Sequence, residues 1–323
     1  MYGYYYFRRQ SYEKVERFLY LCSNFHYMSK VTGRFAPSPT GRMHLGNVFS
    51  ALLSWLSARS QGGQWLLRIE DIDRGRSRQA WADLLMDDLQ WLGLTWDGEP
   101  VYQSQRSDFY EHYFHVLQQQ GQTYPCYCTR ADLLATQAPH ESDGRVVYPG
   151  TCRHKTPQPG VPAATRLMVP DETITFTDGH YGKHSVNLAE QVGDFIIRRK
   201  DGAWAYQLVV VIDDALMGVT EVVRGCDLLL SAPQQIWLAE LLGFKAPQFT
   251  HLPLLCNQQG QRLSKRDQSL DMASLRERYS AQEIIGLLAH QAGLLAEPAP
   301  VTPTDLIPLF SWDKVPTNSI IMA

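Results

Sequence analysis

Strand-like and helix-like segments alternate in the first part of the chain. Short strands are expected over residues 33–36 and 65–69, and helices over 44–56, 79–92 and 107–120. Within each expected helix, the apolar residues recur at helical spacing. Strands that alternate with helices of this length are typical of parallel βα units. The sequence therefore predicts an α/β fold built on a parallel sheet.

The second half of the chain contains further regular segments. Strands are expected over 165–169, 173–176, 194–199, 219–224 and 249–255, with a helix over 232–242. Residues 206–212 are largely apolar, so periodicity does not distinguish a buried strand from a buried helix. A few short helices are expected after residue 270.

Between residues 122 and 162 the chain is rich in turn residues, and three of its six cysteines lie there. These are Cys126, Cys128 and Cys152, whereas Cys22, Cys226 and Cys256 are scattered. Six cysteines in 323 residues do not form the pattern of a secreted disulfide framework. The clustering instead indicates a metal site in a reducing compartment, and hence a cytoplasmic protein.

Composition excludes several classes of protein. The chain is 44% hydrophobic and 20% charged, with a formal net charge of −3. Moderate charge and dispersed Gly and Pro exclude disordered and collagen-like chains. No apolar run reaches the ~18 residues of a membrane span, so we expect a soluble protein with no membrane partner. The acidic balance argues against non-specific coating of nucleic acid but leaves room for a local basic patch on RNA.

Two short segments have the composition of phosphate sites. Residues 37–47 form a Pro/Gly loop at an expected helix start, where backbone N–H groups favour anions. In this loop His44 offers a donor, and Gly46 allows a nucleotide close to the backbone. In the second segment, residues 262–266, Lys265 can neutralise charge that develops on phosphates. Taken alone, His44 also fits a capping or core role, and the second segment a solvated basic turn.

Together, in this order, the two segments resemble the paired nucleotide-binding motifs of class I aminoacyl-tRNA synthetases. The resemblance is narrowed to the glutamyl and glutaminyl branch by residues 34–41, 44–47 and 68–73. Further matches to this branch lie at residues 194–199, 205–208, 211–214 and 223–228. The resemblance spans about residues 31–270. Arg262 stands where lysine is usual, which retains the positive charge, and Lys265 is in place.

Within this branch, the chain most resembles a stand-alone form of the glutamyl catalytic domain. Only 57 residues follow Arg266, which leaves no room for helical anticodon-binding domains. The resemblance implies that glutamate is activated with ATP and Mg²⁺ to glutamyl-adenylate, without tRNA. Glutamate would then pass to the queuosine base at the wobble position of the tRNA(Asp) anticodon. The alternatives are a minimal glutamyl-tRNA synthetase that charges the acceptor end, or a non-catalytic synthetase-like RNA-binding regulator. We expect a monomer.

The resemblance also implies which residues bind the substrates. Glutamate is expected at Arg34, Phe35, Ala36, Pro37, Ser38, Glu70, Tyr206 and Arg224, and ATP at His44, Gly46, Asn47 and Lys265, with His44 and Lys265 catalytic. Guanidinium groups pair strongly with carboxylates, which suits Arg34 and Arg224. Glu70 follows a strand, where ligands bind in open parallel sheets, and its carboxylate suits an ammonium group. For Glu70 and Arg224 the alternative is a structural ion pair.

The clustered cysteines suit one structural zinc ion, since three thiolates need one further oxygen or nitrogen ligand. The resemblance implies Tyr148 as this ligand, and His154 is the conventional candidate. Three unliganded thiols are the alternative.

These segments divide the chain into five parts. They are an N-terminal extension (1–30), the first half of a Rossmann-like catalytic domain (31–121), a zinc-bearing insertion (122–192), the second half with the lysine loop (193–270), and a short helical C-terminal segment (271–323). Met28 lies just before the first expected strand, so residues 1–27 are either a gene-start artefact or a genuine aromatic arm.

Overall fold

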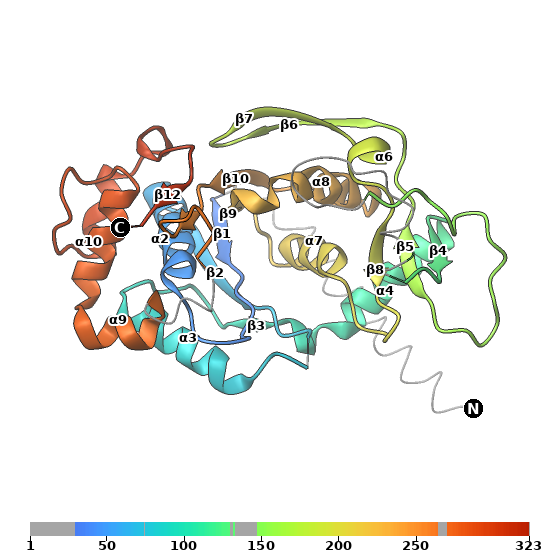
Figure 1. The fold of residues 1–323 in the computed structure, drawn as a ribbon, viewed down its shortest axis with the longest axis horizontal. Helices are drawn as coiled ribbons and strands as arrows, with labels where there is room; N and C mark the ends of the chain where they lie inside the picture. Colours follow the sequence, from blue (N-terminus) through green and yellow to red (C-terminus); the bar gives the residue numbers. More distant parts are fainter. Residues whose placement is uncertain (1–29, 74, 130–131, 133–146, 264–269, 323) are drawn as a thin grey trace.

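The structure is a computed structural model that describes residues 30–73, 75–129, 132, 147–263 and 270–322. Most of the N-terminal extension, including Cys22 and Met28, lies outside the described residues, as do Lys265 and Arg266. The centre of the molecule is a sheet flanked by helices (Figure 1). Its strands are β1 (Thr32–Phe35), β2 (Gln64–Ile69), β3 (Val101–Tyr102), β9 (Glu221–Gly225) and β10 (Gln248–Leu252).

The strand pairings of this sheet are parallel. Strand β1 pairs with β2, β2 pairs with β3, and β9 pairs with β10. The amide of Thr220, just before β9, donates to the carbonyl of Thr32 over 2.9 Å. The strand order is therefore β3-β2-β1-β9-β10, and it reverses between β1 and β9. Ligands of open parallel sheets bind at the carboxyl ends of the strands at such a reversal. The predicted α/β fold with a parallel sheet is confirmed.

Five longer helices accompany the sheet. They are α2 (Leu45–Ser60), α3 (Gln79–Trp91), α4 (Ser107–Gln119), α7 (Tyr206–Leu216) and α8 (Ala232–Leu241). Helix α2 is buried on nearly every side because it packs between the sheet and the C-terminal helices. The ambiguous residues 206–212 belong to helix α7, which is buried along most of its length, including Asp213 and Asp214. Short 3₁₀ turns, η1 (Gln103–Gln105) and η2 (Cys226–Ser231), precede α4 and α8.

The turn-rich region contributes a second, antiparallel sheet. Strand β4 (Thr123–Cys126) pairs with β5 (Ala164–Leu167), which pairs with β8 (Phe195–Arg198). This sheet thus includes one strand beyond residue 192. Strands β6 (Thr173–Asp178) and β7 (Gly182–Asn187) form a hairpin that lies above β10 and α8 in Figure 1, followed by α6 (Leu188–Gln191). Strand β7 was not predicted, because its sequence is largely polar and both of its faces are partly exposed.

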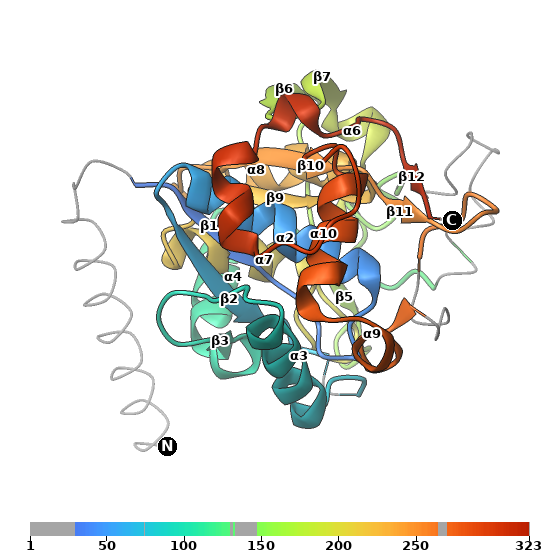
Figure 2. The same ribbon diagram turned by 90° about the vertical axis from the view of Figure 1, so that its left-hand side faces the viewer.

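The C-terminal segment packs against α2 (Figure 2). It contains the expected short helices, α9 (Met272–Arg278), α10 (Ala281–Gln291) and α11 (Pro303–Leu306), with the 3₁₀ turns η4 (Ile307–Leu309) and η5 (Trp312–Lys314). It also contains an unpredicted strand, β12 (Ile320–Ile321), which pairs in parallel with β11 (Leu255–Cys256). In the part of the chain that the structure describes, no helix combines the length and apolarity that crossing a membrane requires.

Candidate active site

A cavity of about 430 Å³ lies beyond the carboxyl ends of β1 and β2. Its volume is in the range of small-molecule sites, about 300–1,000 Å³. Three of the predicted glutamate-binding residues line it: Ser38 after β1, Glu70 after β2, and Tyr206 at the start of α7. Residues distant in the sequence therefore meet where the topology predicts a ligand.

The loop after β1 is fastened to the loop after β2. The Pro37 carbonyl accepts the amide of Glu70 over 3.0 Å. Phe35 is buried and stacks on Trp65, with ring centroids 5.9 Å apart, so its ring belongs to the core. Phe35, Ala36 and Pro37 lead into the cavity wall but are not among its lining residues, in contrast to Ser38. Their expected contribution to glutamate binding therefore stays a prediction.

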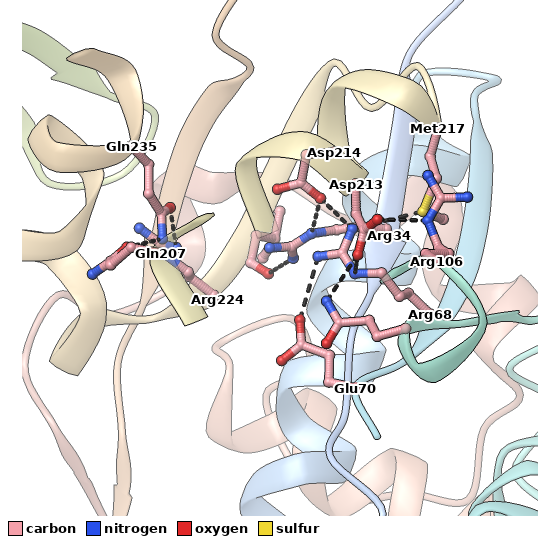
Figure 3. A network of polar contacts seen from close by, with 12 residues as sticks. Arg34, Arg68, Glu70, Arg106, Gln207, Asp213, Asp214, Met217, Arg224 and Gln235 are labelled. Carbon is pink, nitrogen blue, oxygen red and sulfur yellow. Dashed lines mark hydrogen bonds and ion pairs between the residues drawn. The ribbon is translucent and has the colours of Figure 1, made fainter. Parts of the chain in front are cut away.

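Glu70 belongs to a buried network of charges (Figure 3). The guanidinium of Arg68, which is fully buried, approaches Glu70 Oε1 at 3.4 Å and donates to Asp214 Oδ1 at 2.6 Å. Arg34 Nε donates to the same Asp214 oxygen over 3.3 Å. Asp214 thus holds two guanidinium groups in place, and one of them holds Glu70.

The neighbouring Asp213 anchors the network to helix α4. It is fully buried and accepts hydrogen bonds from Gln103 Nε2 at 2.9 Å, Arg106 Nε at 2.6 Å and the Tyr110 hydroxyl at 2.8 Å. Such a carboxylate is well compensated, because each partner donates in a low-dielectric interior. Asp213 and Asp214 together fix α7 against β2 and the start of α4.

The carboxyl groups of Asp214 and Glu70, which both contact Arg68, differ in their environments. Burial works against ionisation of Asp214, but Arg68 and Arg34 outweigh it and lower the pKa of this carboxyl. Burial raises the pKa of the Glu70 carboxyl, and the same two arginines only oppose the rise. Glu70 lines the cavity and is the less compensated carboxylate. It is therefore the group that a substrate cation would stabilise.

Arg224 lies on β9, across the reversal of strand order from β1. Its NH1 donates to Gln235 Oε1 over 2.7 Å, its NH2 to the Leu228 carbonyl over 3.2 Å, and its Nε to His251 Nε2 over 3.1 Å. No carboxylate among the described residues forms an ion pair with it at 4.0 Å or less. Burial lowers the pKa of its guanidinium. A buried cation without a paired anion is costly, so Arg224 favours an anionic ligand rather than a structural ion pair.

His44 is the N-cap residue of α2 and is buried, so it occupies the capping position that the sequence left open beside a phosphate-binding role. Its amide donates to the Asn47 side-chain oxygen over 3.1 Å, so Asn47 stabilises the first turn of the helix. A Cβ at Gly46 would lie 3.1 Å from the His44 ring, which explains why glycine stands there. That Cβ would also lie 4.0 Å from Leu263, so the second motif runs beside the first.

The other side of the lysine loop also returns to this point. Asp271 forms a β-bridge with His44, and the Met272 amide donates to the Met43 carbonyl over 2.9 Å. Arg262 forms an ion pair with Asp227. Leu263 and Asp271, which lie on either side of the lysine loop, are therefore close to the N-terminus of α2, although Lys265 itself is outside the described residues.

The three clustered cysteines meet in space. The Sγ atoms of Cys126, Cys128 and Cys152 lie within 4.8 Å of one another. The Tyr148 hydroxyl oxygen is 3.5 Å from Cys126 Sγ and 3.8 Å from Cys128 Sγ. His154 is exposed and is not part of the group. The geometry therefore favours Tyr148 over His154 as a fourth ligand.

The surroundings of this cluster affect its acidic groups differently, since burial raises the pKa of the Cys128 thiol to about 11 and also raises the pKa of the Tyr148 phenol. Burial works against ionisation of Cys152, but hydrogen bonds from the Tyr127 backbone and the Tyr148 hydroxyl lower the pKa of its thiol to about 7. Arg166 Nε donates to Cys126 Sγ over 3.2 Å, and its guanidinium lies 3.7 Å above the Tyr148 ring. A positive charge at this distance offsets the excess negative charge of a site with three thiolates.

Several residues of these sites were not predicted from the sequence. They are Arg68, Asp213 and Asp214 in the buried network, Arg106 beside them, and Arg166 at the thiol cluster. The available signal was charge inside apolar segments, since Arg68 interrupts a buried strand and two consecutive aspartates interrupt the apolar helix α7. Buried charges are rare unless they are paired.

The comparisons with known proteins agree with this geometry. Residues 30–285 match the family model described as tRNA synthetases class I (E and Q), catalytic domain. The chain belongs to this family, which makes it a ligase of the aminoacyl-tRNA synthetase type.

Individual relatives narrow the likeness further. A glutamyl-Q tRNA(Asp) synthetase of Symbiobacterium thermophilum is 46% identical over 307 residues, which covers 89% of this chain and 94% of the relative. A protein of the same name from Deinococcus radiodurans is 48% identical over 296 residues, covering 88% and 97%. A crystal structure of a glutamate tRNA ligase from Elizabethkingia meningosepticum, in complex with its amino acid, has a TM-score of 0.77 and 30% identity, covering 91% of this chain and 67% of that one.

Proposed function

We propose that this chain activates L-glutamate with Mg-ATP, without tRNA, and transfers it to the queuosine base in the anticodon of tRNA(Asp). The observation that supports the first half, glutamate activation, is the pair of Glu70, a carboxylate that lines the cavity, and Arg224, a buried cation that forms no ion pair with a carboxylate among the described residues. An acidic amino acid offers an ammonium group to Glu70, in addition to its 3.4 Å contact with Arg68, and a carboxylate to Arg224. The names of the relatives similar over about nine-tenths of the chain support the second half.

In the proposed first step, the glutamate α-carboxylate attacks the α-phosphate of ATP, and pyrophosphate leaves. Glu70 binds the ammonium group, while Arg224 and Arg34 bind carboxylates. His44 and the N-terminus of α2 bind phosphate, and Lys265 stabilises charge on the leaving pyrophosphate. The products of this step are glutamyl-adenylate and pyrophosphate.

In the second step, a hydroxyl of the queuosine cyclopentene ring attacks the activated carbonyl. The bond between the carbonyl carbon and the phosphate oxygen breaks, AMP leaves, and an ester forms. The hydroxyl proton leaves with solvent or AMP. No protein nucleophile is required in either step.

Glutamate-dependent exchange of labelled pyrophosphate into ATP tests the first step. The full chain should exchange label with glutamate in the absence of tRNA, and should not do so with glutamine or aspartate. The same assay with added tRNA should give a similar rate. Exchange that requires tRNA, or no exchange at all, would overturn tRNA-independent activation.

Replacement of Glu70 by Gln should weaken glutamate binding selectively. The variant loses a charge-assisted contact with the ammonium group, worth about 1.5–3 kcal/mol, so the KM for glutamate should rise about 10- to 100-fold. The KM for ATP should change little, because His44, Gly46 and Asn47 at the N-terminus of α2 do not line the cavity that Glu70 lines. Glu99→Gln, at an exposed position, is the matched control in the exchange assay. An unchanged glutamate KM in Glu70→Gln would remove Glu70 from the site.

We also propose that Cys126, Cys128, Tyr148 and Cys152 bind one structural zinc ion. The converging thiols, the nearby phenol and the Arg166 guanidinium support this assignment. The ion would tie β4 to the turn-rich segment that carries Tyr148 and Cys152, where few apolar residues are available to stabilise the fold. Its function would be to hold this segment, so no catalytic step involves it.

Removal of one ligand should abolish zinc binding. Wild-type protein should contain about one zinc per chain by elemental analysis, and Cys128→Ser should contain much less and unfold at a lower temperature. Cys226→Ser is the control, since Cys226 lies on η2 outside the cluster and should leave the zinc content unchanged. Wild-type zinc content in Cys128→Ser would contradict the proposed ligand set.

A further inference from the structure

A buried imidazole that the proposed mechanism does not use lies directly behind Arg224. His251, on β10, is fully buried, and so is its partner Asp178 at the end of β6. The Nδ1 atom of His251 lies 2.6 Å from Asp178 Oδ2. On the other side of the ring, Arg224 Nε donates to His251 Nε2 over 3.1 Å. The three side chains form a continuous chain of hydrogen bonds.

The chemistry of these groups determines the tautomer of His251. A guanidinium only donates, so Nε2 must carry the lone pair that accepts from Arg224. The ring proton therefore sits on Nδ1, where it is donated to the Asp178 carboxylate. The imidazole is neutral, and the carboxylate selects the tautomer that Arg224 requires.

We propose that Asp178 and His251 are positioning residues that orient the Arg224 guanidinium toward the carboxylate of the amino-acid substrate. This inference rests on the proposed glutamate-binding role of Arg224. His251 accepts from Nε, while Gln235 and Leu228 accept from NH1 and NH2. Acceptors on all three nitrogens fix the plane of the guanidinium before the substrate arrives, which reduces the entropy lost on binding.

The fold holds Asp178 firmly in this place. Its Oδ1 accepts the backbone amides of His251 at 3.1 Å, His180 at 3.0 Å and Tyr181 at 2.9 Å. The next residue, Gly179, donates its amide to the Phe249 carbonyl over 2.9 Å. A Cβ at Gly179 would lie 2.3 Å from Thr250 Oγ1, so only glycine allows this approach. The β6–β7 hairpin is thus fastened to β10 at the point where it presents Asp178 to His251.

Protonation of His251 would remove the acceptor that Arg224 uses. The titratable or charged groups that face His251 are Asp178 from β6, Arg224 from β9, and His180, whose Nδ1 lies 2.9 Å from the His251 carbonyl. Burial lowers the pKa of His251, although Asp178 opposes this effect. The acceptor is therefore present at neutral pH and is lost only on acidification below the usual pKa of a histidine side chain. Glutamate binding should weaken over that acid range.

Two amide substitutions separate positioning from simple packing. In His251→Gln, the side-chain amide reaches the Nε2 position and can still accept from Arg224. In His251→Asn, the amide reaches only the Nδ1 position, so it can donate to Asp178 but not accept from Arg224. Neither amide titrates. In both variants, therefore, the glutamate KM should lack the rise at acid pH, here called the acid limb, that is assigned to protonation of His251.

The test measures the KM for glutamate and for ATP in the exchange assay across pH 5.5–8, with the wild-type enzyme as the reference. At neutral pH, His251→Asn should raise the glutamate KM about tenfold and leave the ATP KM within about twofold, while His251→Gln stays near wild type. His180→Gln is the control, because His180 lies in the turn of the same hairpin and its ring contacts the backbone carbonyls of His251 and Val315 and not Arg224.

Equal glutamate KM values for the Asn and Gln variants would overturn the proposal, as would a parallel rise in both KM values. If His251→Asn does not fold, the comparison of wild type with His251→Gln tests the positioning role of His251. The proposal then requires an acid limb in the wild-type glutamate KM that the Gln variant lacks, and an identical limb in both would refute it. Failure of the proposed function is distinguishable, because the wild-type enzyme would then show no glutamate-dependent exchange at any pH.

Discussion

Replacement of Arg224 by Leu should lower kcat/KM for glutamate about 100-fold or more in the pyrophosphate exchange assay. A guanidinium–carboxylate pair in a buried site is worth about 3 kcal/mol, and this variant removes it entirely. The loss should appear mainly in the glutamate KM, since Arg224 lies on β9 and the phosphate loop precedes α2. Removal of Arg224 leaves no unpaired carboxylate behind, so the protein should still fold.

Two further variants serve as comparisons for Arg224→Leu. Arg224→Lys keeps the charge but not the fixed fork of donors, so it should recover only part of the lost activity. Arg278→Leu, at an exposed position on α9, should behave as wild type. A glutamate KM that rises less than about threefold in Arg224→Leu would show that another group binds the substrate carboxylate.

Replacement of Arg68 by Met should destabilise the protein strongly. Arg68 is fully buried and pairs with both Asp214 and Glu70, so its removal leaves negative charge in the interior without compensation. Breaking a buried ion pair from one side costs about 3–5 kcal/mol, which corresponds to a fall in Tm of about 10 °C for a chain of this size. The surviving folded fraction should also bind glutamate poorly, because Glu70 loses its support.

Thermal denaturation followed by circular dichroism measures this effect. The matched control is Arg76→Met, whose guanidinium is 76% exposed and pairs with Asp73 at the surface, and which should shift Tm little. An equally small shift for Arg68→Met would mean that the buried carboxylates are neutral or hydrated, contrary to the network described above.

Local sequence signals predicted the parallel sheet and the strand–loop–helix that carries His44. Helix α2 and strand β2 each combine a consistent periodicity with a clear end at glycine or acidic residues, so neighbouring signals agree. Helix α7 was ambiguous because it is buried on all sides and therefore lacks a polar face. Strand β7 was missed for the opposite reason, since its stability comes from pairing with β6 and not from burial of its own side chains.

The residues Ser38, Glu70 and Tyr206, which line the cavity, lie in motifs that the sequence shows, but the roles of the residues that support them were not predicted. Asp214 lies 180 positions along the chain from Arg34, and Asp178 lies 73 positions from His251. No local sequence signal predicts that such residues are in contact. Their contacts arise from the strand order β3-β2-β1-β9-β10 and from the hairpin that crosses β10, which are properties of the assembled fold.

Transfer of labelled glutamate to purified tRNA(Asp) tests the central claim most directly. Two preparations should be compared at equal concentration, one with queuosine at the wobble position and one with unmodified guanosine. The account predicts labelling of the queuosine-containing tRNA alone, stable to removal of the 3′-terminal nucleotide. Equal labelling of both preparations, or label lost with the 3′ end, would contradict base modification and favour charging of the acceptor end.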